Sequence, residues 1–184
     1  LVIMQTLKAM QMAMQNRLLE QKAFVDAHTG LPNKNACNEL LNKKDIITDS
    51  TACIMFDLNN LKTVNDTMGH SAGDQLILNF ARLLRNVIPE KDFVGRYGGD
   101  EFMAVIYHTS QTEVEEILKC LCLEKDRLNN REDKMLIDYA YGWALSAKDG
   151  EYTIQTLLDK ADSYMYENKQ LCKRYSLTSE VESF

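Results

Sequence analysis

The sequence has few of the residues that interrupt regular structure, with two prolines and eight glycines among 184 residues. This scarcity leaves little room for disordered linkers, and a hydrophobic content of 45% suffices for one globular domain with a sizeable core. No apolar run approaches 18 residues, and no signal-peptide pattern is present. The sequence therefore predicts neither a membrane span nor membrane contact by this chain.

Disulfide pairing is also not expected. The five cysteines are odd in number and show none of the paired spacings of a disulfide framework. Cys120 and Cys122 stand too close together for ordinary zinc-ligand spacing, and Cys53 lies inside an apolar run, as a small buried hydrophobe does. A reducing, cytoplasmic location fits this cysteine usage best.

Basic residues are outnumbered, with 21 Lys and Arg against 27 Asp and Glu, a formal net charge of −6 and a pI near 5.1. Binding to nucleic-acid backbones needs clustered basic residues, so no nucleic-acid partner is expected. The first residue is Leu rather than Met, and we interpret the chain as a fragment of a longer protein.

Residues 1–25 carry an apolar stripe at alternating spacings of about three and four, which is typical of a coiled coil. The stripe consists of Ile3, Leu7, Met10, Met14, Leu18 and Val25, with Gln21 as its one polar position. This helix either packs on its own domain or pairs with another chain as a signalling helix. A turn at 26–33 separates it from the compact domain predicted over 26–184.

Within that domain, strand-like and helix-like runs alternate. Periodicity predicts helices at about 34–44, 71–88, 111–129 and 153–170, and strands at about 51–57, 93–97, 101–107 and 135–146. Because two of the central strands form a hairpin, the sheet should be mainly antiparallel, and the fold class is α+β.

Two segments place acidic residues at strand ends. In the run 95–102, a Gly98-Gly99 pair between strand-like runs indicates a two-residue hairpin, since glycine adopts positive φ freely and lets a ligand approach the backbone. Its tip carries Asp100 and Glu101, either as a solvated acidic turn or for metal chemistry. The apolar run 51–57 ends on Asp57, as a buried central strand with an acid at its C-terminal end does.

The chain resembles the diguanylate cyclases of the GGDEF family. The resemblance lies in motifs that follow one another in the family's order over residues 26–173: DAHTGLPN at 26–33, DLNNLKTVND at 57–66, GHSAGD at 69–74, GGDEF at 98–102 and ADSYMY at 161–166, together with Lys169. It implies a ferredoxin-like, polymerase-palm-like nucleotide-cyclase fold. The implied reaction joins two GTP molecules into cyclic di-GMP, with a homodimer needed for catalysis and a sensor region upstream.

Phosphoryl transfer of this kind depends on positioning and on charge neutralisation by divalent ions. The resemblance implies two Mg²⁺ (or Mn²⁺) ions per active site. It assigns them Asp57, Asp100 and, by position, the Leu58 carbonyl. Glu101 either completes the second metal's shell or accepts the 3′-hydroxyl proton, and the sequence does not separate Asp100 from Glu101 in that role.

The substrate contacts follow from the same resemblance. Main-chain N–H groups around Asn60, Leu61 and Lys62 are expected to cradle phosphates, as helix N-termini do. The family usually has Asp at Asn59 and Phe at Leu61. Further expected contacts to the triphosphate come from Lys169 and, where the family has Arg, from Lys173 or its neighbour Arg174.

Asn65 and Asp74 are expected to read guanine, whose adjacent N–H donors one carboxylate accepts together. His70 is expected to shape the loop and contribute weakly to the nucleotide pocket. A rival structural role exists for Asp74, because Ser71-x-x-Asp74 resembles a capping box.

Two alternatives to a cyclase are a regulatory module that binds GTP or cyclic di-GMP without turnover, and a purely structural dimerisation domain. The family's product-binding Arg-x-x-Asp appears here with Pro89 in place of Arg and with Asp92 retained. Because proline has neither charge nor side-chain donor, high-affinity product binding there is not expected.

Overall fold

The computed structural model describes the backbone of residues 2–130, 136–147 and 150–181, and the side chains of the same residues except 21 and 171–181. The elements run in the order α1 (Val2–Phe24), α2 (Lys34–Leu41), β1 (Thr51–Leu58), α3 (Leu61–Met68), α4 (His70–Val87), β2 (Phe93–Arg96), β3 (Glu101–Tyr107), α5 (Gln111–Asn129), β4 (Tyr139–Leu145) and α6 (Ile154–Val181). None of these helices is long and apolar enough to cross a bilayer, as far as the described residues go.

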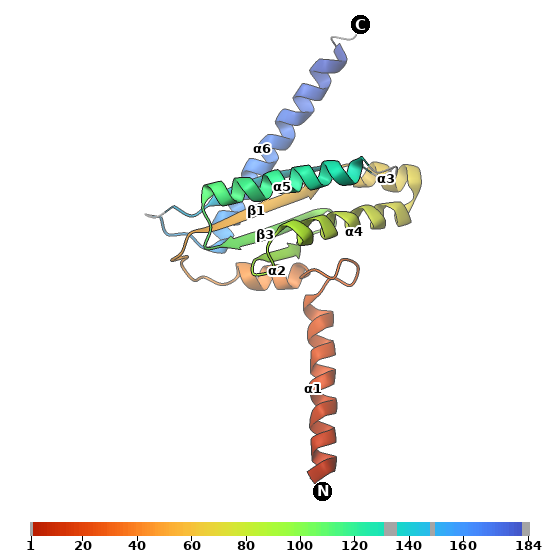
Figure 1. Cartoon of the computed structure of the whole chain (residues 1–184), viewed down its shortest axis with the longest axis vertical. Helices are drawn as coiled ribbons and strands as arrows, with labels where there is room; N and C mark the ends of the chain where they lie inside the picture. Colours follow the sequence, from red (N-terminus) through yellow and green to blue (C-terminus); the bar gives the residue numbers. More distant parts are fainter. Residues whose placement is uncertain (1, 131–135, 148–149, 182–184) are drawn as a thin grey trace.

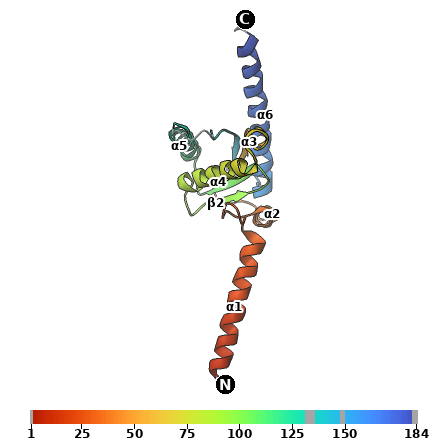
Figure 2. The same cartoon turned by 90° about the vertical axis from the view of Figure 1, so that its right-hand side faces the viewer.

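The four strands form one sheet in the order β2-β3-β1-β4, and every neighbouring pair is antiparallel. Helices α4 and α5 cover one face, and α2 and α6 cover the other (Figures 1 and 2). The α+β class and the antiparallel sheet expected from the sequence are confirmed.

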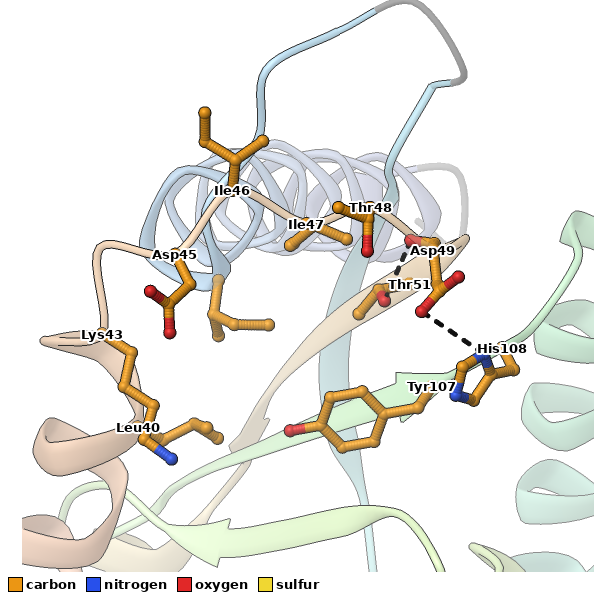
Figure 3. Close-up of a pocket in the computed structure, with 11 residues that line it drawn as sticks. Leu40, Lys43, Asp45, Ile46, Ile47, Thr48, Asp49, Thr51, Tyr107 and His108 are labelled. Carbon is orange, nitrogen blue, oxygen red and sulfur yellow. Dashed lines mark hydrogen bonds and ion pairs between the residues drawn. The ribbon is translucent and has the colours of Figure 1, made fainter.

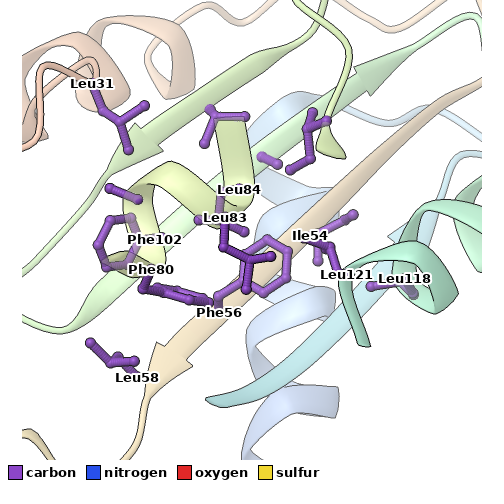
Figure 4. Close-up of a cluster of buried hydrophobic side chains, with 14 of the residues drawn as sticks. Leu31, Ile54, Phe56, Leu58, Phe80, Leu83, Leu84, Phe102, Leu118 and Leu121 are labelled. Atoms are coloured by element: carbon purple, nitrogen blue, oxygen red, sulfur yellow. The ribbon is translucent and has the colours of Figure 1, made fainter. Parts of the chain in front are cut away.

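The core on the α4 and α5 side follows from strand alternation in β1. Ile54, Phe56 and Leu58 point to this face and are at most 1% exposed. Phe80 of α4 packs on this face, with its ring centroid 5.0 Å from that of Phe102 in an edge-to-face arrangement (Figure 4).

The other face of β1 carries Cys53 and Met55, which pack against the apolar stripe of α6. Gly142 of β4 makes this packing possible. A Cβ at this position would lie 2.2 Å from the carbonyl oxygen of Ala161 and 2.2 Å from the nitrogen of Met165. Because both atoms belong to the α6 backbone, the missing side chain lets the helix lie directly on the sheet. Asp57 belongs to this same face by alternation.

Helix α1 extends away from the sheet (Figures 1 and 2). Its stripe is exposed, from 38% at Val25 to 76% at Ile3, so α1 does not pack along its own domain. Near its end, the amide groups of Asn33 and Asn35 donate to the Ala23 carbonyl at 3.0 and 3.1 Å, while Asn33 Oδ1 also caps α2. One asparagine thus joins the two helices.

Several boundaries differ from those expected. Helix α3, of which only a start near Lys62 was expected, spans Leu61–Met68. Helix α2 ends at Leu41, and α6 continues to Val181 rather than ending near 170. The predicted strand at 135–146 is β4 over Tyr139–Leu145, and residue 135 lies outside the described residues. Helix α5 has the predicted bounds because Ser110 and Glu113 form a complete capping box.

Candidate functional site

The two strand-end acids predicted from the sequence lie side by side. Asp57 of β1 is the register partner of Glu101 of β3. The next backbone bond, from Leu58 N–H to the Asp100 carbonyl, is 2.8 Å long, which makes Leu58 and Asp100 the hydrogen-bonded pair and Asp57 and Glu101 the non-hydrogen-bonded pair. Side chains are closest in pairs of the latter kind, and like charges directly opposite each other are destabilising.

The electrostatics of Glu101 reflect this crowding. Burial raises the pKa of Glu101, and the negative charges of Asp100, Asp57 and Asp162 raise it further. A smaller opposing effect comes from the positive charge of Lys34. The site therefore collects more negative charge than it neutralises around Glu101, and a cation bound there would relieve the repulsion.

Asp57 has a cationic partner of its own. Lys169 Nζ lies 2.7 Å from Asp57 Oδ1, and the two side chains are 32% and 15% exposed. Lys169 follows the buried stripe of α6 by four residues after Met165, so the helix carries it to the end of β1. The resemblance had assigned Lys169 to the substrate triphosphate, and its carboxylate partner was not foreseen.

The glycine turn before Glu101 differs from the predicted two-residue hairpin. The N–H groups of Tyr97 and Gly98 both donate to the Glu101 carbonyl, at 2.9 and 3.1 Å, and neither Gly98 nor Gly99 has positive φ. The prediction that glycine is needed here for its backbone conformation is wrong. A Cβ at Gly98 would instead lie 2.5 Å from Glu101 Oε2, whereas a Cβ at Gly99 would meet no atom within 4 Å.

Arg96 supports the Gly98–Gly99 turn through hydrogen bonds, a role that was not predicted from the sequence. Its Nη2 and Nε donate to the Gly99 carbonyl at 2.8 and 3.3 Å, and its Nη1 lies 3.2 Å from Asp26 Oδ1. Burial raises the pKa of Asp26, but hydrogen bonds from Thr29 and the charge of Arg96 outweigh it and hold that pKa below its ordinary value. A charged residue within the strand-like run 93–97 was the available signal.

The predicted phosphate loop lies at the start of α3. Asn60 has φ 63°, its side chain makes no capping bond, and its carbonyl accepts from Val64 N–H at 2.9 Å. The first turn of α3 therefore has no side-chain cap, which suits an anion. Leu61 packs against the core, whereas Lys62 is exposed.

The two predicted guanine readers lie on neighbouring helices. A Cβ at Gly73 would stand 2.0 Å from Asn65 Oδ1, so the Asn65 amide lies against Gly73, next to Asp74 in α4. The capping-box alternative for Asp74 is wrong, because α4 begins at His70 after Gly69 and has no side-chain cap. Asp74 and His70 are both exposed, and the Asp74 carbonyl lies 2.8 Å from His28 Nε2.

Two further predictions concern the phosphate contact of Lys173 or Arg174 and the product site at Asp92. The Lys173 and Arg174 side chains lie outside the described residues, so their phosphate contact stays a prediction. Asp92 Oδ1 accepts from Tyr107 N–H at 2.9 Å, and its Oδ2 is buried without a hydrogen-bond partner. Asp92 thus supports the end of β3, and the lack of high-affinity product binding at Pro89–Asp92 stays a prediction.

The comparisons with known proteins agree with the motifs. The family described as diguanylate cyclase, GGDEF domain, matches residues 23–174. The chain belongs to the GGDEF family.

Similar curated proteins include signaling protein YkoW of Bacillus subtilis, 31% identical over 83% of this chain and 20% of its own length. Cyclic di-GMP phosphodiesterase PdeR of Escherichia coli is 32% identical over 80% of this chain and 23% of its own length. Diguanylate cyclase DgcN of Escherichia coli is 31% identical over 84% of this chain and 39% of its own length. The GGDEF domain thus spans between about one fifth and two fifths of these relatives.

The coiled coil and GGDEF domain of DgcB from Caulobacter crescentus, solved with cyclic di-GMP, superposes with a TM-score of 0.79 at 22% identity over 92% of each chain. At that identity the likeness shows the fold. It confirms the nucleotide-cyclase fold expected from the sequence.

A separate pocket lies at the other end of the sheet, where Thr51 of β1 pairs with Tyr107 of β3 (Figure 3). It encloses about 300 Å³, and the Tyr107 side chain points into it. Six register positions separate it from Asp57, which is roughly 20 Å along a strand. Its ionic contact, Asp49 with His108 at 3.8 Å, is exposed, and none of the motif acids lines it.

The acids fit a metal that the substrate helps to hold. Among the described residues, no three His, Cys, Asp or Glu side chains are arranged to hold an ion by themselves. Mg²⁺ usually takes one or two carboxylates and completes its shell with phosphate oxygens and water. Asp57 with Asp100 or Glu101 provides such a partial donor set, with the mutual repulsion that a divalent cation offsets.

The two turn glycines give a matched test of the site. Gly99→Ala meets no atom of the chain, so the melting temperature should stay unchanged while GTP binding weakens at least tenfold, because the methyl group would occupy ligand space. Gly98→Ala should instead displace the Glu101 carboxylate. Thermal unfolding and calorimetric titration with GTP measure both effects. Wild-type GTP affinity in Gly99→Ala would show that no ligand approaches this turn.

Proposed function

We propose that this domain is a diguanylate cyclase that condenses two GTP molecules into cyclic di-GMP and releases two pyrophosphates. The observation that carries the proposal is the pairing of Asp57 with Glu101, next to Asp100, at one end of the sheet. The three acids are partly buried, and like charges that are withdrawn from water are costly, which is typical of sites where chemistry needs them. The family match over residues 23–174 and the relative named diguanylate cyclase support the same reaction.

Two Mg²⁺ (or Mn²⁺) ions, held by Asp57, Asp100 and the Leu58 carbonyl, would neutralise phosphate charge and activate the attacking 3′-hydroxyl. Glu101, whose pKa is raised by burial and by its acidic neighbours, is suited to sharing or accepting that proton. Lys169 and the first turn of α3 bind the triphosphate.

Guanine lies between Asn65 and Asp74 in this proposal. The exposed Asp74 carboxylate, which makes no capping bond, is available for the adjacent N–H donors of the base. Gly99 leaves room for the nucleotide to approach the turn. These contacts position the substrate, and the acids place its reacting groups.

One domain binds one GTP, so joining two requires two copies that face each other with two-fold symmetry. The exposed stripe of α1 supports this arrangement, since a helix with so much apolar surface is unstable alone in water. A sensor region preceding α1 in the same protein, and a cytoplasmic location, complete the proposal. The short share of each relative that the chain covers supports further domains.

The competing function is a GGDEF module that binds GTP or cyclic di-GMP without turnover. The match to PdeR, a relative named phosphodiesterase, favours it as the second candidate. The two functions separate on product formation alone.

Incubating the protein with GTP and Mg²⁺ and separating the nucleotides tests the reaction. Wild type should form cyclic di-GMP, and Asp57→Ala or Asp100→Ala should lower turnover at least 100-fold because each removes a charge that holds the metal ions. Asp49→Ala, an acid at the opposite end of β1, should stay within about twofold of wild type. GTP binding without cyclic product in wild type would support the silent module. Activity within tenfold of wild type in either variant would contradict the metal assignment.

The α1 stripe can be tested in the full chain with two matched double variants. Met10→Gln with Met14→Gln changes stripe residues that are 66% and 69% exposed. Met4→Gln with Met12→Gln makes the same chemical change at 72% and 64% exposed positions off the stripe. The Met10→Gln, Met14→Gln variant should dissociate into monomers and lose activity at low protein concentration, because its stripe is less apolar. Both the dimer and the activity should be partly regained when the protein is concentrated. Sedimentation and activity that are identical in the two variants would contradict pairing through the stripe.

A further inference from the structure

The contact between Lys169 and Asp57 has a consequence for metal binding. The ammonium lies 2.7 Å from Asp57 Oδ1, and the pair is partly buried, with Asp57 only 15% exposed. Partly buried charges are screened less than surface charges, so this pair interacts more strongly than an exposed one. Asp57 also faces Glu101 directly across the strand pair, and the positive charge of Lys169 offsets part of that repulsion.

The position of Lys169 is imposed by packing. Gly142 lets α6 lie on β4, and the buried residues Ala161 and Met165 fix the rotation of the helix. The next position on the same face is Lys169, four residues later. Among the described residues, Lys169 is the only basic side chain that hydrogen-bonds to Asp57.

A divalent cation and this ammonium compete for one carboxylate. Mg²⁺ binds oxygen at about 2.0–2.1 Å, so an ion on Oδ1 displaces the ammonium, and an ion on Oδ2 stands a few ångströms from a like charge. In either arrangement, metal binding to Asp57 is less favourable than it would be without Lys169. A nucleotide changes the balance, because its phosphates offer the flexible lysine another anion.

We propose that Lys169 is an internal counter-ion that competes with the divalent cation for Asp57, so that metal binds tightly only together with a nucleotide that takes the ammonium away. The proposal deepens the proposed function, since it rests on Asp57 as a metal ligand. Linkage makes the effect reciprocal: metal on Asp57 frees Lys169 for phosphate, and phosphate on Lys169 frees Asp57 for metal.

The test measures Mn²⁺ binding to the full chain by electron paramagnetic resonance with no nucleotide added. Lys169→Met should bind Mn²⁺ at least about tenfold more tightly than wild type, within the usual range of coupling between sites. Lys169→Arg, which keeps the charge, should bind as weakly as wild type. The control Lys160→Met removes a lysine of the same helix whose ammonium contacts Tyr152, and should also match wild type.

Adding a non-hydrolysable GTP analogue should reduce or reverse the difference, because Lys169→Met then lacks its phosphate contact. The added tightness should disappear in the double variant Lys169→Met with Asp57→Ala. Lys169→Met that binds Mn²⁺ no more tightly than wild type, or a gain that survives Asp57→Ala, would overturn the proposal. Mn²⁺ binding needs no turnover, so the counter-ion role stands or falls separately from cyclic di-GMP formation.

Discussion

One unfavourable contact shapes the site, namely the pairing of Asp57 with Glu101 across two adjacent strands. Their position in a non-hydrogen-bonded pair brings the side chains close together, and burial together with the neighbouring negative charges raises the pKa of Glu101. Such a pair lowers the stability of the isolated sheet. The features around it either offset this charge or keep the two carboxylates in place.

The positive charge that offsets the repulsion comes from the last helix, and the contacts that support the turn involve the segment after the first helix. Helix α6 brings Lys169 to Asp57 through its close packing over Gly142. From the N-terminal side, Asp26 and Arg96 connect the turn after α1 to the Gly99 carbonyl, one residue before Asp100. The turn at Gly99 is therefore held by the segment that follows α1, and Asp57 next to it is held by the last helix.

Much of the fold could be predicted because local signals agree with tertiary packing. The capping box at Ser110 marks the start of α5, and the apolar run that ends at Asp57 predicts β1 to within one residue. The family and the antiparallel sheet were also predicted and are confirmed. The resemblance had placed Asp57 beside Asp100, whereas the residue directly opposite Asp57 is Glu101. The roles of the site residues stay predictions.

The rest depends on contacts between distant segments, which no local pattern contains. Gly98 is explained by the Glu101 carboxylate above it rather than by its φ angle. The Ser71 pattern matched a capping box, but α4 starts one residue earlier, at His70. The partner of Lys169 lies 112 residues away, and that of Arg96 lies 70 residues away.

The most direct test of the paired carboxylates as a cation site is anomalous scattering from Mn²⁺ in crystals of the protein with a non-hydrolysable GTP analogue. The account predicts an anomalous peak within bonding distance of the Asp57 carboxylate, with the Lys169 ammonium moved onto the phosphates. A peak coordinated only by phosphate oxygens and water, with Lys169 still paired to Asp57, would contradict it.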